Sequence, residues 1–197
     1  MSLFKYFFCL LYFGLIWTDI FQSEHKIQLV SLRGGYIEVK GSTNINTFSC
    51  GINNYLGNDT LKFTNTGTSI KGSGLLKCDV IAFNCKMKPM TADLLKTLNE
   101  SKYPHFYIKI YKLSKMPNFR NNEVIPGSAQ ITLSGVSVNY DMNFRFSINP
   151  NGTIMISGKK QVNFSDFRMI PPSKVGGMIK TNQQLDVEFK ILFIKSN

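Results

Sequence analysis

The stretch VSVNYDMNFRFSI, residues 136–148, decides the fold class, because apolar and polar side chains alternate along it without a fault. A period of two is typical of a β-strand with one buried and one solvated face. At ~3.4 Å per residue the strand would be about 44 Å long, whereas an ordinary strand has ~5–6 residues. So long a strand needs an equally long apolar surface opposite it.

The same alternation returns near the C-terminus, where apolar Leu185, Val187, Phe189, Ile191 and Phe193 are separated by polar residues over most of the run. Two long amphipathic strands predict a tall antiparallel barrel or sandwich. A tall barrel can hold a long apolar ligand in its interior.

The rest of the chain adds shorter strands and one helix. Strands are predicted over residues 27–32, 36–39 continuing into 41–50 with a break at Gly41, 61–64, 69–83, 106–111, 129–133 and 153–157. Thr91 is expected to cap the helix, with Asp93 in its first turn and an apolar stripe of Leu94, Leu95 and Leu98. We therefore expect an all-β fold: an extended antiparallel barrel of about eight strands in meander order, with one short helix that plugs or covers an end.

Composition narrows the possible partners. The 197 residues suit one domain, and 43% hydrophobic residues with 16 Phe can build a substantial core. The net charge of +11 favours binding to anionic lipid headgroups or phosphates, and therefore a peripheral contact with membranes. The alternative is that the surplus lysines only keep the surface soluble. No run of Lys and Arg exceeds two residues, so we expect no nucleic-acid partner.

The N-terminal segment resembles an export signal. Lys5 is followed by an apolar run from Tyr6 to Trp17, which is short for a membrane span of ~20 residues and right for a signal-peptide core of ~7–15. We expect residues 1–23 to be a signal peptide and 24–197 the mature domain, exported to the periplasm or the extracellular space. The cleavage signal is poor because Phe21 is not small, so an uncleaved N-terminal anchor is the alternative.

Catalytic and metal-binding groups do not assemble in this sequence. His25 and His105 are the only histidines, and neither has partners at a defined spacing. Cys50, Cys78 and Cys85 match no zinc signature. We therefore expect no enzyme, no metal site and no cofactor; an enzyme that uses carboxylates alone is the alternative.

Several motifs occur in a characteristic order. They are GSTNINTFSC at 41–50, MTADLLK at 90–96 before Tyr103-Pro104, FSDF at 164–167, IPP at 170–172 and GGMIK at 176–180. Over residues 28–194 the chain thereby resembles the YceI-like family, in particular its Bacteroidetes-type members. Family members are similar to lipocalins in shape: exported barrels with a long apolar tunnel that accommodates polyisoprenoid or other lipid chains. They are often dimeric, so a homodimer is expected from the resemblance alone, since no feature of the sequence requires one.

The chain departs from the best-known members near its first strand. Their histidine-containing stretch has no counterpart, because His25 precedes the strand and Gly34-Gly35-Tyr36 takes its place. The resemblance therefore leaves the identity of the ligand open.

If the apolar face of each long strand points into the barrel, eight side chains are expected to line the tunnel: Val138, Tyr140, Met142, Phe144, Phe146, Val187, Phe189 and Ile191. Arg168, with Lys174, is the candidate contact for an anionic headgroup, and an ordinary exposed arginine is the alternative. In barrels of about eight strands side chains can also fill the interior. The chain would then be a structural or interaction module with no ligand.

The cysteines bear on the pairing of the strands. If residues 74–85 form one strand, Cys78 and Cys85 face opposite sides about 24 Å apart, which is too far for a disulfide. Cys50 is then the shared partner. The family resemblance implies that it pairs with Cys85 and that Cys78 is a buried thiol.

Overall fold

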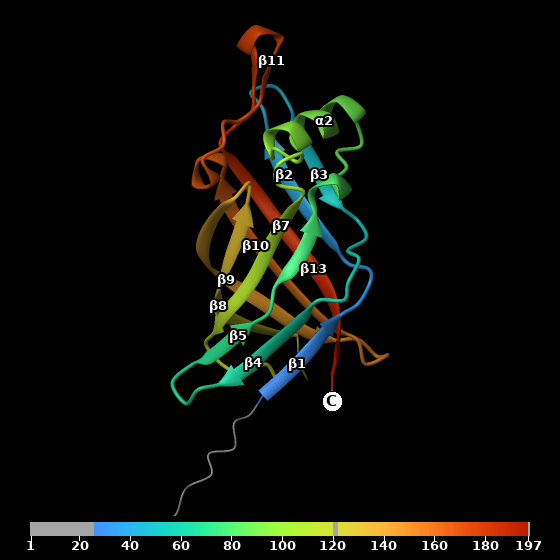
Figure 1. Ribbon diagram of the computed structural model, residues 1–197, viewed down its shortest axis with the longest axis vertical. Coiled ribbons are helices and arrows are strands. Elements are labelled where there is room, and N and C mark those ends of the chain that lie inside the picture. The colour runs from blue at the N-terminus through green and yellow to red at the C-terminus, as the bar shows by residue number, and fades with distance from the viewer. Residues whose placement is uncertain (1–25, 120–121, 197) are drawn as a thin grey trace, which may run out of the picture.

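The structure, a computed structural model, describes residues 26–119 and 122–196. It is a tall antiparallel β-barrel with a short helix across one end (Figure 1), which confirms the expected fold class. The expected meander order was wrong for the first strands, because β1 lies beside β4, and β2 and β3 lie beyond β13. The expected signal peptide, residues 1–23, lies outside the described residues.

The elements follow one another as β1 (Lys26–Ser31), β2 (Tyr36–Ser42), β3 (Thr47–Ile52), β4 (Thr60–Asn65), β5 (Ile70–Ser73), β6 (Leu76–Asp79), η1 (Val80–Ala82), α2 (Lys88–Thr97), β7 (His105–Leu113), β8 (Glu123–Leu133), β9 (Val136–Ile148), β10 (Ile154–Asn163), η2 (Phe164–Phe167), β11 (Ser173–Lys174), η3 (Val175–Gly177), β12 (Ile179–Lys180) and β13 (Gln184–Lys195).

The barrel closes through its last strand. The ring runs β1-β4-β5-β7-β8-β9-β10-β13, and β13 returns to β1. The same edge of β13 has two neighbours, because Lys195 lies opposite Leu29 of β1 whereas Val187 lies opposite Val39 of β2. We call the part closed by β1 and β4 the lower half, and the part closed by β2 and β3 the upper half, as they stand in Figure 1.

The two halves are closed differently. β1 pairs with β4 in a regular ladder in the lower half. In the upper half, β3 meets the segment after β6 at one bridge, in which Gly51 and Asn84 exchange two N–H···O bonds of 2.9 Å. Beside this bridge, a disulfide joins Cys50 to Cys85, with Cα atoms 4.0 Å apart. This is the pairing that the family resemblance implied, and Cys78 is a buried free thiol.

The core of the lower half is built from phenylalanine rings. Phe63, Phe146 and Phe193 are completely buried. The ring of Phe146 packs edge-on against Phe63 at 6.1 Å and against Phe119 at 6.0 Å between centroids. Side chains therefore fill this part of the barrel.

Two strand predictions were wrong. The segment 36–50 is not one strand broken at Gly41 but the hairpin of β2 and β3, because the hydroxyl of Thr43 accepts the backbone N–H of Ile45 and Asn46 and fixes a turn. The segment 69–83 is also interrupted, since Gly74 adopts a φ of 109° between β5 and β6. Residues 74–85 are therefore not a single strand.

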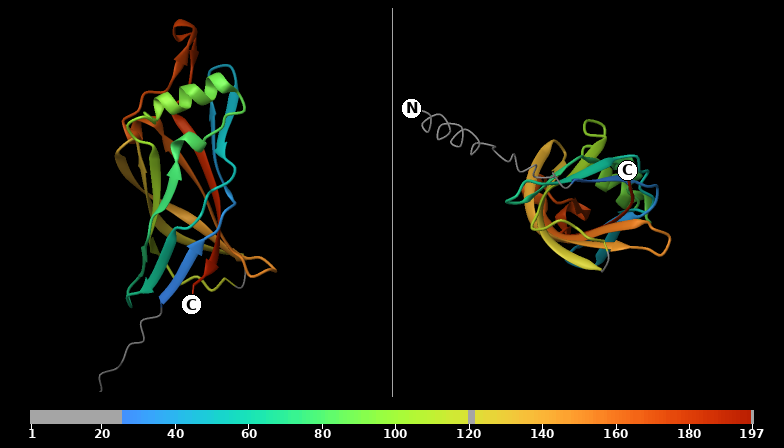
Figure 2. Two further views of the ribbon diagram at one scale, coloured as in Figure 1. Left: turned by 45° about the vertical axis from the view of Figure 1, so that its right-hand side comes forward. Right: turned by 90° about the horizontal axis from the view of Figure 1, so that it is seen from below.

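The helix differs from the prediction at its start. α2 begins at Lys88, with Pro89 in its first turn, and has no acidic residue in that turn. Thr91 is inside the helix and caps nothing: its hydroxyl donates to the carbonyl of Met87 and accepts the N–H of Cys85 at 3.0 Å. As expected, the helix covers one end of the barrel, the upper one (Figure 2, left).

Candidate apolar ligand site

The upper half of the barrel contains an apolar cavity of about 80 Å³ beneath α2. The side chains around it are mostly aliphatic and come from elements far apart in the sequence. They include Val39 of β2, Leu94 of α2, Ile131 and Leu133 of β8, Val162 of β10 and Val187 of β13. We call this space the inner cavity.

A second apolar pocket of about 310 Å³ lies at the same end, between α2, the β2–β3 turn and the β11–β12 hairpin. Ile45, Phe48, Met87, Met90, Pro172 and Ile179 form much of its lining, and Asp93 and Lys174 also line it. Leu94 and Phe164 line both this outer pocket and the inner cavity, so they form the wall between the two.

β9 shows how the interior changes along the barrel. Its even-numbered residues up to Phe146 face inward, as the alternation predicted. Phe144 and Phe146 are completely buried in the lower half, whereas Val138, Tyr140 and Met142 are only half-buried. The ladder between β9 and β10 also stops at the pair Phe144–Gly158.

The structure separates the eight predicted tunnel residues into three groups. Val187 lines the inner cavity. Val138, Tyr140 and Met142 belong to the half-buried inner face of β9 and do not line the cavity. Phe144, Phe146, Phe189 and Ile191 are buried in the packed core, where the rings of Phe144 and Phe189 lie 6.3 Å apart. Contact of any of these eight residues with a ligand stays a prediction.

The two predicted headgroup residues have different surroundings. Lys174 lines the outer pocket and forms an ion pair of 2.7 Å with Asp93 of α2. Arg168 is exposed, ends η2 with a φ of 57° and lines neither the pocket nor the cavity. The structure therefore brings Lys174, and not Arg168, to the site.

Four residues of the site were not predicted from the sequence: the wall residues Leu94 and Phe164, and Ile45 and Phe48 of the β2–β3 hairpin. The apolar stripe of α2 was the available signal for Leu94, although it indicated only that the helix would cover an end. Nothing in the local pattern indicated the hairpin residues, since segment 36–50 was read as one strand.

A polar contact holds η2 against β9 where β10 no longer pairs with it. The hydroxyl of Tyr140 donates to Oδ2 of Asp166 at 2.9 Å, and burial and this bond raise the pKa of Tyr140. The backbone N–H of Asn163 and the Tyr140 hydroxyl lower the pKa of Asp166. Nearby, Nζ of Lys160 donates to the carbonyl of Asp141 at 2.9 Å and lies above the Tyr140 ring.

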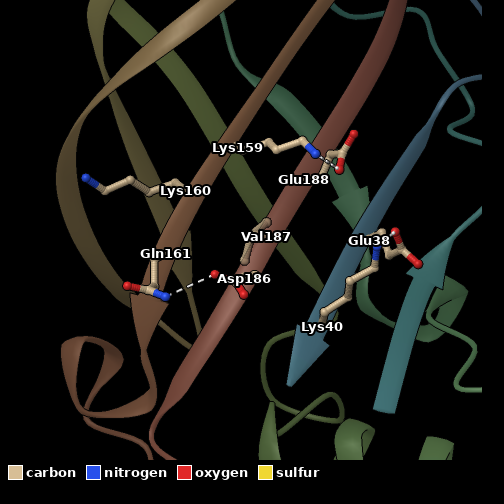
Figure 3. Close-up of a pocket in the computed structure, with 8 residues that line it drawn as sticks. All are labelled: Glu38, Lys40, Lys159, Lys160, Gln161, Asp186, Val187 and Glu188. Carbon is tan, nitrogen blue, oxygen red and sulfur yellow. Dashed lines mark hydrogen bonds and ion pairs between the residues drawn. The ribbon is translucent and has the colours of Figure 1, made fainter. Parts of the chain in front are cut away.

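The groove in Figure 3, about 330 Å³, lies over β2, β13 and β10 and is lined mainly by charged residues, with Val187 also in its lining. Most of its charged groups pair with one another: Lys159 pairs with Glu188 at 2.8 Å and Lys40 with Glu38 at 3.1 Å. The bonds from Lys159 and Tyr36 lower the pKa of Glu188 against the effect of desolvation. We interpret this groove as a solvated outer face of the barrel and not as the ligand site.

The described residues offer little for catalysis. Nδ1 of His105 lies 2.8 Å from Oδ1 of Asp79, on β7 and β6. Burial raises the pKa of the Cys78 thiol, which disfavours the reactive thiolate. No three His, Cys, Asp or Glu side chains within residues 26–119 and 122–196 gather as a metal ion would require. None of the helices described is long and apolar enough to cross a membrane.

The fold and the site together define the class: a lipocalin-like barrel with an apolar cavity at its helix-covered end. Among solved structures, the chain is similar to a polyisoprenoid binding domain from Saccharophagus degradans implicated in plant cell wall breakdown, with a TM-score of 0.61 and 11% identity over 87% of this chain and 100% of that one. It is also similar to BcnA of Burkholderia cenocepacia, with a TM-score of 0.59 and 12% identity over 81% of this chain and 95% of that one.

A Campylobacter jejuni YCEI protein matches more weakly, with a TM-score of 0.46 and 15% identity over 66% of this chain and 71% of that one. No protein-family model and no curated protein matches the chain. At these identities the two stronger likenesses establish the fold. This fold is the barrel that the resemblance in the sequence implied.

Proposed function

We propose that this protein is an exported YceI-like carrier that binds a long-chain apolar molecule, isoprenoid or fatty-acid-like, in the upper half of its barrel without changing it chemically. The observation that carries the proposal is the inner cavity with the outer pocket directly beyond Leu94 and Phe164. The fold shared with a polyisoprenoid binding domain supports it. The disulfide is compatible with an oxidising compartment outside the cytosol.

The volumes indicate how a long chain would bind. Ligand pockets are usually ~300–1,000 Å³, so the inner cavity of about 80 Å³ is too small by itself. A group the size of a water molecule or a methylene occupies ~30 Å³, so the inner cavity holds only about two or three such groups. The outer pocket supplies about 310 Å³ more. Binding a long chain therefore requires the wall of Leu94 and Phe164 to open, which an outward shift of α2 would achieve.

The energetics of such binding are those of apolar burial, about 25 cal/mol for each Å² removed from water. The charged groups would orient the ligand. Lys174, which lines the outer pocket, is the proposed contact for an anionic head, and its ion pair with Asp93 would open or be shared. Arg168 follows η2, which contributes Phe164 to the wall, and is the second proposed contact.

The direct test is native mass spectrometry of protein purified from its own host, followed by solvent extraction. We expect a long-chain apolar molecule to remain bound and to be released by the solvent. Protein that carries none, and that takes up neither a polyprenol nor a fatty acid in a binding assay, would contradict the proposal.

A matched pair of variants on β13 tests the location. Val187 lines the inner cavity, whereas Ile191 is 1% exposed in the packed core. Val187→Phe should occupy the cavity and abolish retention of the ligand, with little change in the free energy of unfolding. Ile191→Phe should overpack the core and cost ~1–3 kcal/mol. Retention that is unaffected by Val187→Phe would place the ligand elsewhere.

The alternative function is a structural or interaction module, and the fully buried rings of Phe63, Phe146 and Phe193 in the lower half of the barrel favour it. In that case both variants should destabilise the protein and neither should alter a ligand. A homodimer remains a prediction from the family resemblance, which sedimentation equilibrium of the purified protein would test.

A further inference from the structure

The most exposed large apolar side chains of the described residues lie together at the upper end. Ile170, Met178 and Val175 are 86%, 73% and 64% exposed, more than any other large apolar side chain described. Val175 and Met178 belong to the β11–β12 hairpin, which projects beyond α2 in Figures 1 and 2, and Ile170 precedes it. Ile45 and Met87, at the outer pocket, are also mostly exposed. We call these five residues the apolar tip.

The hairpin is held by polar contacts, so its apolar side chains are not needed to place it. Asn44 of the β2–β3 turn accepts the backbone N–H of Lys180 at 2.9 Å and donates to the carbonyl of Met178 at 2.9 Å. On the other strand Lys174 forms the ion pair with Asp93. The hairpin therefore presents apolar side chains to the solvent while hydrogen bonds fix its position.

The backbone of the hairpin is strained at Val175, which has a φ of 52°. The left-handed conformation is costly for a β-branched residue and is easily adopted by Gly or Asn. The side chain of Val175 is exposed, so burial within the chain does not offset that cost. Strain of this kind is characteristic of residues that act in binding.

The charges around the apolar tip are mostly positive, and Asp93, the partner of Lys174, is the acidic residue of the outer pocket. Residues 168–181 contain Arg168, Lys174 and Lys180 and no acidic residue. Lys86 and Lys88, beside Met87, are exposed as well. Within the described part of the chain, only Lys174 of these five cations has a carboxylate partner.

We propose that the upper end docks on a bilayer that contains anionic lipids. The apolar tip enters the boundary between headgroups and acyl chains, and the surrounding cations lie at the anionic headgroups. Peripheral binding commonly combines these two contributions, and each Lys or Arg near an anionic surface adds to it. The outer pocket lies beside the apolar tip, so a docked molecule would have that pocket at the membrane surface.

The test measures partition of the purified full chain into phosphatidylcholine vesicles with and without phosphatidylglycerol. The double variant Val175→Asn/Met178→Gln removes apolar surface and lets residue 175 keep its φ without strain. We expect it to reduce partition into the anionic vesicles at least ~10-fold. Its matched control is Ile148→Gln/Ile194→Gln, which changes two exposed apolar residues of the lower half and should leave partition unchanged.

The contribution of charge has its own pair of variants. Arg168→Gln/Lys180→Gln should lower partition into anionic vesicles several-fold and weaken its dependence on salt, because fewer cations meet the headgroups. Lys71→Gln/Lys195→Gln changes two exposed lysines of the lower half, opposite β4 and β1, and should have little effect. Equal losses in the two pairs would reduce the contact to a nonspecific effect of net charge and overturn the proposal.

Hydrogen exchange locates the contact. Amides of residues 168–181 should become protected when anionic vesicles are added. Protection that instead rises with protein concentration in the absence of vesicles would mean that a second copy of the chain covers the apolar tip, which overturns the proposal. Docking and the proposed carrier function can be tested separately. Val175→Asn/Met178→Gln should bind vesicles poorly but still retain an extractable ligand. Val187→Phe should lose the ligand but still bind vesicles.

Discussion

The lower and upper halves of the barrel share the long strands β9 and β13, yet they differ in what fills them. In the lower half, buried phenylalanine rings from several elements pack together, and those of Phe63, Phe146 and Phe193 have no exposure. In the upper half, mostly aliphatic side chains surround the inner cavity. An alternating strand thus determines which side chains face inward, whereas the residues opposite determine whether any space is left. The predictions below test that division.

The largest expected effect is the loss of a core ring in the lower half. Phe146→Ala removes a side chain that touches the rings of Phe63 and Phe119 and should cost ~3–5 kcal/mol in the free energy of unfolding. The matched control in the upper half is Val138→Ala on the same strand, which should cost under ~1.5 kcal/mol because Val138 is only half-buried. Urea denaturation measures both values. Equal losses would mean that the two halves are packed alike.

An intermediate effect is expected at the closure of the upper half. Cys50→Ser/Cys85→Ser removes a disulfide that spans 35 residues, and such crosslinks typically stabilise by ~2–4 kcal/mol. Only one backbone bridge then joins β3 to the segment after β6. Hydrogen exchange should accelerate first in β2, β3 and α2, before β1 and β4. Uniform acceleration around the barrel would show that the halves unfold as one unit.

The smallest effect is expected at the contact between η2 and β9. The pKa of Asp166 is lowered in the folded state, so this carboxylate stabilises the fold above its unfolded pKa of ~4, and the contribution disappears as pH falls through the lower folded pKa. Asp166→Asn should therefore cost ~1 kcal/mol near pH 7 and less once the pH is below the folded pKa, with solvent screening keeping the value small. Thermal denaturation across this range measures the difference. A cost that is constant with pH would assign the effect to packing.

The sequence predicted the inward face of β9 because alternation in a pleated strand is a local property. It predicted that a helix would cover one end, because the leucine stripe of α2 needs an apolar surface to cover. It did not predict the β2–β3 hairpin, since the turn depends on one hydroxyl, that of Thr43, accepting two backbone N–H groups.

The location of the cavity could not be predicted in the same way. Val187 and Ile191 occupy equivalent positions in one alternating pattern, yet one lines the inner cavity and the other is packed in the core. The difference comes from partners distant in sequence, and local periodicity does not encode them. The pairing of Cys50 with Cys85 likewise followed from the family resemblance, because the premise of a single strand over residues 74–85 was wrong.

The pairing of one edge of β13 with both β1 and β2 also constrains the order of folding. This strand pairs with β1, β2 and β10, and Leu29 must meet Lys195 across almost the whole chain. Synthesis proceeds from the N-terminus, so neither half can close before β13 has been made. Contacts between residues so distant in sequence slow folding, because the loop entropy is lost before the ladder forms. The barrel of a nascent chain should thus remain unclosed, and its apolar strands accessible to chaperones, until synthesis reaches the final strand.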